Sequence, residues 1–365
     1  MQMSKQFLLA LLCAFGLAVS VHSQDQSGFI SLDCGLPAEL SNYTDVNTGL
    51  DYISDAAFIG TGISKTLSPE FNTSDLEKQL WYVRSFPENI RNCYNIKVTN
   101  GTKYLIRARF MYGNYDPKGK APQFQLYLGE NLWAVIGFVN ASTVVSLEII
   151  HVSNLDYIDI CLVNVNLGTP FISALELRPL KSGTYVTKSG SLMLLSRLDM
   201  GSTTNQIVRY KDDIYDRIWT PWNPINPTQL STASALMSSS DYHPPGSVMN
   251  TATTLRNSSA PLVIFFETVD PNSQFYFYLH FAELEELQAN QSREFNIFLD
   301  GKLWYGPLSP TYLDTTTIYT TEPSGRGRNV YQIIKTENST HGPIINAIEV
   351  YVAIEFLKPQ TVTHG

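Results

Sequence analysis

Aromatic, amide and carboxylate side chains lie next to one another at Tyr112–Asp116, where the chain reads Tyr-Gly-Asn-Tyr-Asp. Aromatic rings can cover the apolar face of a sugar, and amides and carboxylates bind its hydroxyl groups. The segment follows the end of a predicted strand, and loops at the rim of a β-sandwich commonly present ligands. We therefore predict a ligand-binding role for Tyr112, Asn114, Tyr115 and Asp116. The alternative is that Tyr112 ends the apolar face of the strand and Tyr115 packs a turn.

The segment Arg209–Trp219 reads Arg-Tyr-Lys-Asp-Asp-Ile-Tyr-Asp-Arg-Ile-Trp and combines opposite charges with aromatic rings. Two interpretations are open. The segment is either a clamp of ion pairs and stacked rings between two domains, or one wall of a ligand cleft, since pockets favour domain interfaces. The second interpretation predicts that a ligand contacts Tyr210, Asp213, Asp216 and Trp219.

Catalytic motifs are absent from the sequence. It contains no Gly-x-Ser-x-Gly elbow, no His-Glu-x-x-His and no phosphate-binding Gly-Lys-Ser/Thr loop. No metal and no cofactor are expected, because metal sites need clustered ligands and the histidines are scattered: His151, His243, His280, His341 and His364. Carboxylates that could in principle form a glycosidase pair are interpreted as solvated or turn-capping: Asp156 and Asp159, and Asp212 and Asp213 with Asp216. We therefore predict that the protein is not an enzyme.

The elements that position these residues occur twice. Phe124–Trp133 and Phe295–Trp304 both read as a Phe-x-(Leu/Ile)-x-Leu strand, a Gly-containing turn and a Leu-Trp that begins the next strand, at an offset of 171 residues. Further pairs of segments match at similar offsets: Arg109-Phe110 with His280-Phe281, Pro170–Leu177 with Pro343–Val350, and Asp33-Cys34-Gly35 with Asp199-Met200-Gly201. A repeat of this length indicates a duplicated domain, since solenoid repeats are only about 20–50 residues long.

Short alternating strands between Gly, Pro and Asn turns predict antiparallel sandwiches. In the clearest of them, Lys103–Tyr112, apolar residues alternate with Lys103, Arg107 and Arg109, which predicts one dry face. The expected fold class is all-β, with two tandem β-sandwich domains packed side by side. We place domain A at 28–180, a linker at 181–194 and domain B at 195–357. Because the linker is short and polar, we expect the domains to pack with a cleft between them.

The first residues predict an extracellular protein. Lys5 followed by the apolar run Phe7–Val21 is typical of a secretory signal peptide, which we place at 1–23. The net charge of −8 argues against nucleic acid and anionic membrane surfaces as partners. No later apolar stretch is long enough to span a bilayer. We expect the chain to be secreted, or held at the plasma membrane through a partner.

Glycosylation and one disulfide are also expected. Seven Asn-x-Ser/Thr sequons favour a glycosylated surface: Asn42, Asn72, Asn100, Asn140, Asn257, Asn290 and Asn338. Cys13 is removed with the predicted signal peptide, which leaves Cys34, Cys93 and Cys161 for one disulfide and one free thiol. The sequence does not determine which two are paired.

Several stretches resemble the malectin-like extracellular region of plant leucine-rich-repeat receptor kinases. They cover nearly the whole mature chain: Phe29–Pro37, Val83–Pro87, Arg91–Tyr94, Tyr104–Ala108, Tyr112–Asp116, Thr169–Leu180 and Tyr215–Trp219. The resemblance implies two tandem malectin-like, jelly-roll-like sandwiches that face each other across a cleft. It also implies sensing of sugars or peptides at the cell surface. The repeats, membrane helix and kinase of that family do not occur in these 365 residues, so we expect a stand-alone or truncated form.

The leading functional hypothesis is a receptor-type ectodomain that recognises cell-wall carbohydrate or a secreted peptide, together with a membrane receptor or co-receptor. A protein–protein adaptor without sugar binding is the first alternative, and a carbohydrate-active enzyme is the second.

Overall fold

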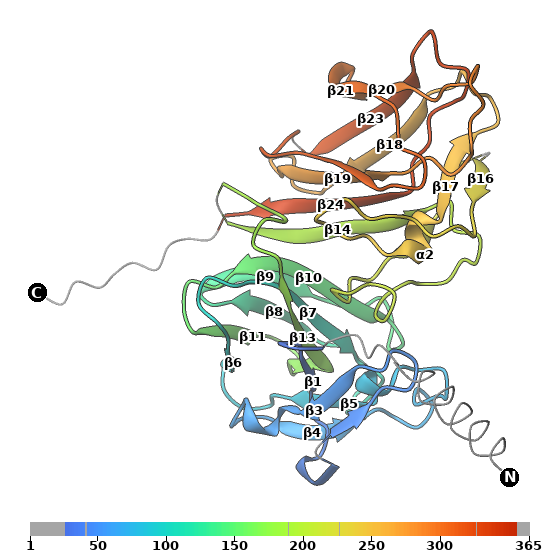
Figure 1. Ribbon diagram of the computed structural model, residues 1–365. Helices are drawn as coiled ribbons and strands as arrows, with labels where there is room; N and C mark the ends of the chain where they lie inside the picture. The colour runs from blue at the N-terminus through green and yellow to red at the C-terminus, as the bar shows by residue number, and fades with distance from the viewer. Residues whose placement is uncertain (1–25, 41, 189, 226, 326, 356–365) are drawn as a thin grey trace, which may run out of the picture.

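The computed structural model describes residues 26–40, 42–188, 190–225, 227–325 and 327–355. The predicted signal peptide at 1–23 lies outside these residues. The described chain is built almost entirely of strands, stacked as two bodies in Figure 1. Helical segments are short: η1 (Ala38–Leu40), η2 (Asp55–Ala57), η3 (Lys78–Leu80) and α2 (Gly246–Met249). The prediction of an all-β fold of two sandwiches packed side by side is confirmed.

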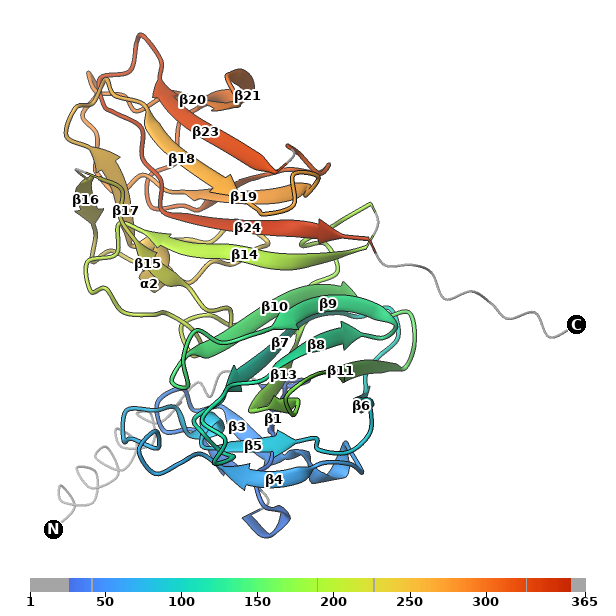
Figure 2. The ribbon, with the colours of Figure 1, turned by 180° about the vertical axis from the view of Figure 1, so that it is seen from behind.

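One large sheet runs through both bodies. Its strands follow the order β2 (Asn42–Thr44), β3 (Asp51–Ser54), β1 (Ile30–Asp33), β13 (Ala174–Leu180), β7 (Lys103–Met111), β10 (Val144–Val152), β14 (Ser191–Met200), β24 (Ala347–Ile354), β19 (Phe275–Phe281) and β22 (Thr316–Tyr319), and β15 (Thr220–Trp222) pairs with β14. Figures 1 and 2 show β10 and β14 side by side at the boundary between the two bodies.

Smaller sheets complete the two sandwiches. The first body adds β6 (Arg91–Lys97), β11 (Tyr157–Leu167), β8 (Gln123–Leu128) and β9 (Asn131–Ile136), and a second small sheet of β12 (Phe171–Ile172), β5 (Tyr82–Ser85) and β4 (Ile63–Thr66). The second body adds β18 (Leu262–Glu267), β23 (Arg328–Lys335), β20 (Phe295–Leu299) and β21 (Lys302–Leu308), and the pair β16 (Pro227–Ser231) and β17 (Thr251–Leu255). The two hairpins expected from the repeat are β8–β9 and β20–β21.

Positions that match in the sequence repeat make the same backbone hydrogen bonds. The N–H of Cys34 donates to the carbonyl oxygen of Ser173 at 2.8 Å, and the N–H of Met200 donates to that of Asn346 at 2.9 Å. These four residues belong to the segments that matched at offsets of 166 and 173 residues. The two halves therefore share a local architecture as well as a sequence pattern.

The glycine after each of these N–H groups is required by the backbone. Gly35 and Gly201 both have φ of +90°, a conformation that glycine adopts without steric cost. A Cβ would lie 2.2 Å from the carbonyl oxygen of Val83 at Gly35, and 2.3 Å from that of Ala252 at Gly201. Each glycine lets its strand end pass directly against a neighbouring backbone.

Three large apolar clusters and a small one, formed by Leu50, Tyr52 and Tyr210, account for the packing of the described residues. One fills each sandwich, and the third lies where the sandwiches meet. This third cluster is rich in tyrosine: Leu105, Ile150, Leu180, Tyr185, Leu192, Tyr215, Tyr242, Tyr276, Tyr278 and Tyr351. Tyrosine suits such a junction because its ring packs as an apolar group while its hydroxyl reaches a polar partner.

The junction differs from the predicted linker in one respect. β14 begins at Ser191, so residues 191–194, assigned to the linker, belong to the strand that joins the halves. Strands β10 and β14 pair only at Ile149 with Met193 and at Ile150 with Leu192. Towards Val144 the two strands are no longer paired, and this separation creates the space described below.

Candidate functional site between the two sandwiches

The segment Arg209–Ile218 is a closed loop. Paired backbone hydrogen bonds between Val208 and Trp219, of 3.1 and 2.8 Å, join its two ends. Asp213 organises the interior: its carboxylate accepts from the backbone N–H of Tyr215 at 2.9 Å and from the indole N–H of Trp219 at 2.7 Å. Aspartate commonly stabilises turns in this way, because its short side chain reaches backbone donors two residues on.

Asp216 connects the loop to Arg107 and Arg178 of the first sandwich. Its φ of +53° is a left-handed conformation that aspartate tolerates, and its side chain is fully buried. The carboxylate accepts from Arg209 Nε at 2.9 Å, from Arg178 Nε at 3.0 Å and from Arg107 Nη1 at 3.2 Å. Burial alone would raise the pKa of Asp216, but the three guanidinium groups hold it well below its usual value.

A second ionic connection crosses the junction at Glu148 on β10. Its carboxylate accepts from Arg107 Nε of the first sandwich and from Arg197 Nη1 of the second, both at 2.9 Å. Arg197 also donates from Nε to Glu349 on β24 at 2.9 Å. Burial opposes ionisation of Glu148, but the two arginines lower its pKa. Together with the contacts of Asp216, these pairs form the interdomain clamp that was one interpretation of Arg209–Trp219.

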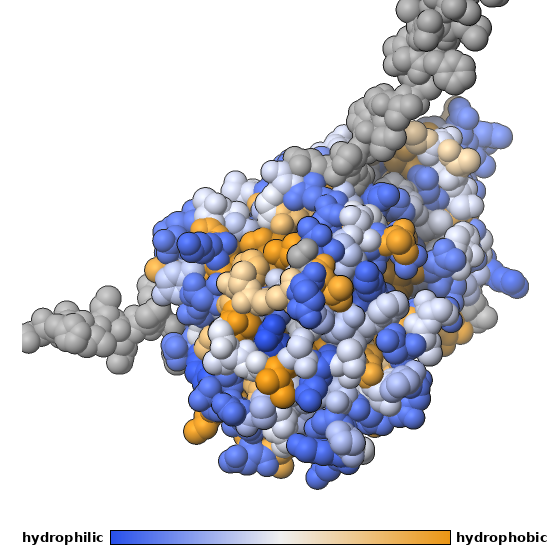
Figure 3. Space-filling model, turned by 90° about the horizontal axis from the view of Figure 1, so that it is seen from below, coloured by the Kyte–Doolittle hydropathy of each residue, from blue (hydrophilic) through white to orange (hydrophobic). Residues whose placement is uncertain are grey.

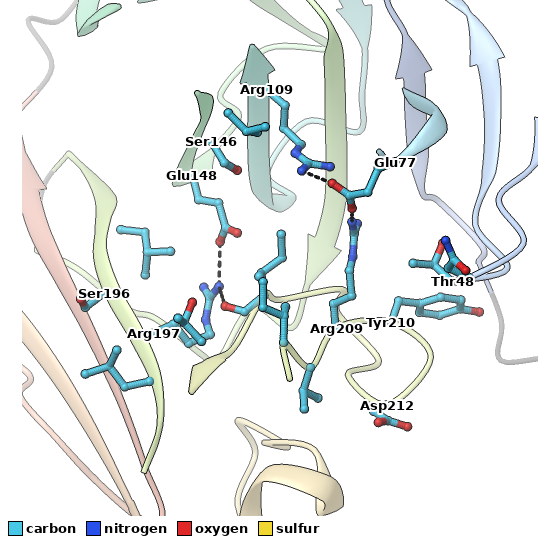
Figure 4. A pocket seen from close by; sticks show the side chains of 18 of the residues that line it. Thr48, Glu77, Arg109, Ser146, Glu148, Ser196, Arg197, Arg209, Tyr210 and Asp212 are labelled. Atoms are coloured by element: carbon cyan, nitrogen blue, oxygen red, sulfur yellow. Dashed lines mark hydrogen bonds and ion pairs between the residues drawn. The ribbon is translucent and has the colours of Figure 1, made fainter. Parts of the chain in front are cut away.

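A cleft of about 880 Å³ opens beside this clamp. Its floor consists of alternate residues of β10, namely Val144, Ser146 and Glu148. Residues of β14 and of the segment that follows it form the opposite wall: Leu194, Leu195, Ser196, Arg197, Leu198, Ile207, Val208, Arg209, Tyr210, Lys211, Asp212, Ile218 and Thr220. The β2–β3 loop closes one end with Asn47 and Thr48, and Glu77 and Arg109 of the first sandwich complete the lining. The cleft thus draws on both halves of the chain (Figure 4).

Arg109 and Glu77 stand at the edge of this cleft. Arg109 Nη2 donates to the carboxylate of Glu77, which also pairs with Arg209 Nη1 at 3.3 Å, as the dashed lines in Figure 4 show. Arg109 is only 6% exposed, yet within the described part of the chain its Nε and Nη1 have no hydrogen-bond acceptor. Buried guanidinium nitrogens normally find acceptors, so these two donors are left unsatisfied by the residues that the structure describes.

The predicted ligand-binding residues of the segment Arg209–Trp219 lie partly in the clamp and partly at the cleft. Asp213, Asp216 and Trp219 are fully buried. The two carboxylates accept from Arg217 and Arg209, and the indole N–H of Trp219 donates to Asp213. Tyr210 lines the cleft and packs edge-on against Phe29 at 5.8 Å. That these residues contact a ligand stays a prediction, and Tyr210 is the one with a surface in the cleft.

The segment Tyr112–Asp116 lies away from the cleft. Tyr112 and Tyr115 are buried, and their rings contact each other with centroids 5.5 Å apart. The hydroxyl of Tyr112 donates to the carboxylate of Asp116, and Asn114 donates to Glu70 at 3.2 Å. The aromatic faces that would stack on a sugar are packed against other protein side chains. Ligand binding at this segment stays a prediction.

Arginines hold two of the carboxylates that line the cleft, Glu77 and Glu148. A glycosidase needs one carboxylic acid with a raised pKa beside a second carboxylate. Glu148 has a lowered pKa, and Glu77 is paired with two arginines. In the described ranges, no group of three His, Cys, Asp or Glu side chains is placed to hold a metal ion.

Several other features of the sequence can be located. All seven sequon asparagines are exposed, and their glycosylation stays a prediction: Asn42, Asn72, Asn100, Asn140, Asn257, Asn290 and Asn338. Cys93 and Cys161, which face each other on β6 and β11, form the disulfide, and Cys34 is a buried free thiol. No helix in the described part of the chain is long and apolar enough to cross a membrane.

Sequence reasoning missed Arg109, Glu77 and Ser146 as site residues. The available signal was a strand of alternating pattern whose polar positions are basic, at Lys103, Arg107 and Arg109. That pattern predicted one dry face, whereas every residue of β7 is buried. Arg107 on this basic face donates to Asp216 of the loop Arg209–Ile218, which comes from the second half of the chain.

The fold and the site define a class of protein: tandem β-sandwiches joined through one sheet, with a cleft between them. The model of the malectin-like domain family matches residues 32–353, and the chain belongs to that family. Curated relatives include a putative leucine-rich repeat receptor-like protein kinase of Arabidopsis thaliana, 46% identical over 97% of this chain and 41% of its own length. Another is the LRR receptor-like serine/threonine-protein kinase IOS1 of the same plant, 44% identical over 96% of this chain and 39% of its own length. The chain therefore spans about two fifths of the curated relatives that it matches.

Solved structures share the fold at low sequence identity. The crystal structure of the ANX1 ectodomain from Arabidopsis thaliana has a TM-score of 0.73 at 15% identity, over 90% of this chain and 97% of that chain. The crystal structure of the plant peptide RALF23 in complex with FER and LLG2 contains a chain with a TM-score of 0.69 at 14% identity, over 89% of this chain and 95% of that chain. The fold of the protein is that of malectin-like receptor-kinase ectodomains.

Proposed function

We propose that this chain is an extracellular, N-glycosylated binding module that takes a secreted peptide into the cleft between its two sandwiches. The observation that carries the proposal is the cleft itself, which measures about 880 Å³ and is lined from both halves of the chain. Pockets of roughly 300–1,000 Å³ at domain interfaces are typical ligand sites. The complex of FER with the peptide RALF23 and with LLG2 supports a peptide ligand and a co-receptor for this fold.

The lining favours a peptide over a sugar. Its second-sandwich wall combines aliphatic and charged residues, with Leu194, Leu195 and Leu198 from β14 and Ile207 and Val208 from the loop on the aliphatic side. Sugar sites instead stack aromatic faces on the pyranose ring, and Tyr210 is the one aromatic side chain among the described residues of the lining. Aliphatic pockets beside charged groups suit the mixed side chains of a peptide.

A glycan attached to a residue that lines the cleft tests the proposal. V144N completes an Asn-Val-Ser sequon with Ser146 on the cleft floor, at a residue that is 39% exposed. L167N completes an Asn-Gly-Thr sequon with Thr169 on β11, outside the cleft lining, and serves as the matched control. Both variants would be produced in a host that glycosylates them, and both would be probed with a displayed library of random peptides and with a glycan array.

We expect V144N to lose peptides that bind the wild-type chain and L167N to keep them. If no peptide binds the wild type, or if V144N binds peptides as well as L167N does, the proposal is wrong. Binding of cell-wall glycans that V144N blocks, without any peptide binding, would assign the cleft to carbohydrate instead.

A second candidate function, the protein–protein adaptor, is favoured by one observation. The edge strands β18 and β21 of the second sandwich carry exposed apolar residues, at Val263, Phe265, Leu303 and Tyr305. By contrast, the end of the first sandwich formed by β3, β4 and β5 is mostly hydrophilic, with a small group of apolar side chains (Figure 3). An adaptor role predicts that F265D abolishes capture of a partner protein while the peptide selection on the cleft is unchanged.

A further inference from the structure

Arg109 and Ser146 occupy facing positions on β7 and β10. They are direct cross-strand partners in the antiparallel pair, so their side chains project from the same face of the sheet into the cleft. Arg109 keeps two buried donors, Nε and Nη1, without an acceptor among the described residues. Ser146 is exposed, and its hydroxyl has no hydrogen-bond partner in the same part of the chain. Figure 4 shows the two side chains on neighbouring strands, with the Arg109 guanidinium turned towards Glu77.

The edge of β10 is open beside them. On one side β10 pairs with β7 along its whole length, from Val144 to Val152. On the other side it meets β14 only at Ile149 and Ile150. In the described ranges, no backbone hydrogen bond joins residues 144–148 to a second strand on that side. Unpaired strand edges are templates on which an extended peptide can add as another strand.

These two observations combine into one binding mode. We propose that the cleft binds a peptide in extended conformation along the open edge of β10, with an acidic side chain of the peptide on the free donors of Arg109. This inference rests on the proposed function, because it specifies which peptides the cleft selects and how their backbone is held.

The distances allow this contact. A strand added to β10 would lie about 10 Å from β7, since neighbouring strands are roughly 4.8 Å apart. Arg109 on β7 has a long side chain, and Ser146 on β10, between β7 and the added strand, has a small one. A glutamate of the peptide would extend from the opposite side. The guanidinium and the carboxylate can therefore meet above Ser146. Charge-assisted hydrogen bonds of this kind are stronger than neutral ones, so an acidic residue is selected over its amide.

Glu77 sets the strength of the site. It already accepts from Arg109 Nη2 and pairs with Arg209, and its side chain is 37% exposed at the cleft edge. Its charge therefore opposes an incoming carboxylate. Removal of that charge with E77Q strengthens the attraction of Arg109 for an acidic peptide, whereas a variant that merely damages the fold would weaken binding.

The test begins with the strongest binder selected by the wild-type chain from the displayed peptide library. Its affinity, and that of the same peptide with its acidic residue changed to the amide, would be measured on the wild type, R109Q and E77Q. We expect the acid-to-amide change to cost about tenfold or more on the wild type and less than about twofold on R109Q, because the cycle isolates the contact. On E77Q we expect the acidic peptide to bind several-fold more tightly. Thermal unfolding of each variant establishes that it is folded.

The backbone mode is tested with N-methyl groups placed on the peptide one residue at a time. A strand added to β10 donates from alternate residues, so N-methylation should abolish binding at every second position and be tolerated between them. Selected peptides without an acidic preference, an acid-to-amide cost that is the same on R109Q, or an N-methyl pattern without alternation would each overturn the inference. Loss of the same peptide on V144N would meanwhile show that the cleft is still its site. Peptides that V144N does not block would instead contradict the proposed function.

Discussion

Removal of the Asp216 charge should destabilise the whole molecule. Asp216 is fully buried and accepts hydrogen bonds from Arg107, Arg178 and Arg209, so D216N leaves these three buried guanidinium groups with Glu176 as the one carboxylate that all of them still share. Loss of one partner from a buried ionic cluster costs about 3–5 kcal/mol. Unfolding entropy of roughly 2.1 cal/mol/K per residue, over a chain of this size, converts this cost into a decrease in Tm of about 4–7 °C.

The assay is differential scanning calorimetry at pH 7, with E322Q as the matched charge-removing control. Glu322 pairs with Lys188 on the surface, where both side chains are more than half exposed. Exposed pairs contribute about 0–1 kcal/mol, so E322Q should change Tm by about 1 °C or less, an effect that added salt removes. The D216N effect should persist in salt because the cluster is buried. A decrease in Tm for D216N no larger than that for E322Q would refute the role assigned to the clamp.

Three further outcomes follow from particular residues. G35A and G201A should each destabilise the protein by similar amounts, because a Cβ would meet a backbone carbonyl oxygen at 2.2 or 2.3 Å. Urea unfolding checks this, and a loss of unfolding free energy in only one of the two variants would contradict it. Replacement of both cysteines of the disulfide, in C93A/C161A, should cost about 4 kcal/mol by loop entropy for a separation of 68 residues, and denaturant unfolding with and without reductant checks this value. Burial would raise the pKa of Glu176, but the arginines around it, Arg107 first, lower that pKa from 4.5 to about 2. A lowered folded-state pKa means that this stabilisation, about 3 kcal/mol, is present above pH 4.5 and is lost as the pH falls towards 2, so the unfolding midpoint of the wild type should drop over that interval.

The strands and the duplication could be predicted from the sequence because they depend on local patterns. Alternation of apolar residues and Gly-containing turns is sufficient to define a hairpin such as β20–β21, where Asp300 and Gly301 adopt the positive φ angles of +48° and +78°. The same motif in β8–β9 then identified the repeat. Offsets of 166 to 173 residues also located the structurally equivalent Gly35 and Gly201, although the two halves share few residues overall.

The polar face of β7 shows why the interface could not be predicted. Arg107 and Arg109 alternate with apolar residues, as they would on a strand with one face in water. The partners of Arg107, which are Glu176 and Asp216, lie 69 and 109 residues from it in the chain. Burial of such charges depends on a second sandwich that supplies counter-ions, and the local pattern carries no information about that approach.

The open edge of β10 is a consequence of the same duplication. In two copies of one sandwich, the large sheets could have remained separate. Here β10 and β14 join them into one sheet through only two residue pairs. The strands then separate over Val144–Glu148, where ion pairs rather than backbone hydrogen bonds hold the halves together. The junction is held by backbone pairing at one end and by ion pairs at the other. The unpaired backbone groups of β10 and the donors of Arg109 therefore lie beside the same cleft. Neither the open edge of β10 nor the unsatisfied donors of Arg109 can be deduced from one copy alone. The cleft exists only because the pairing of the two sheets ends after two residue pairs.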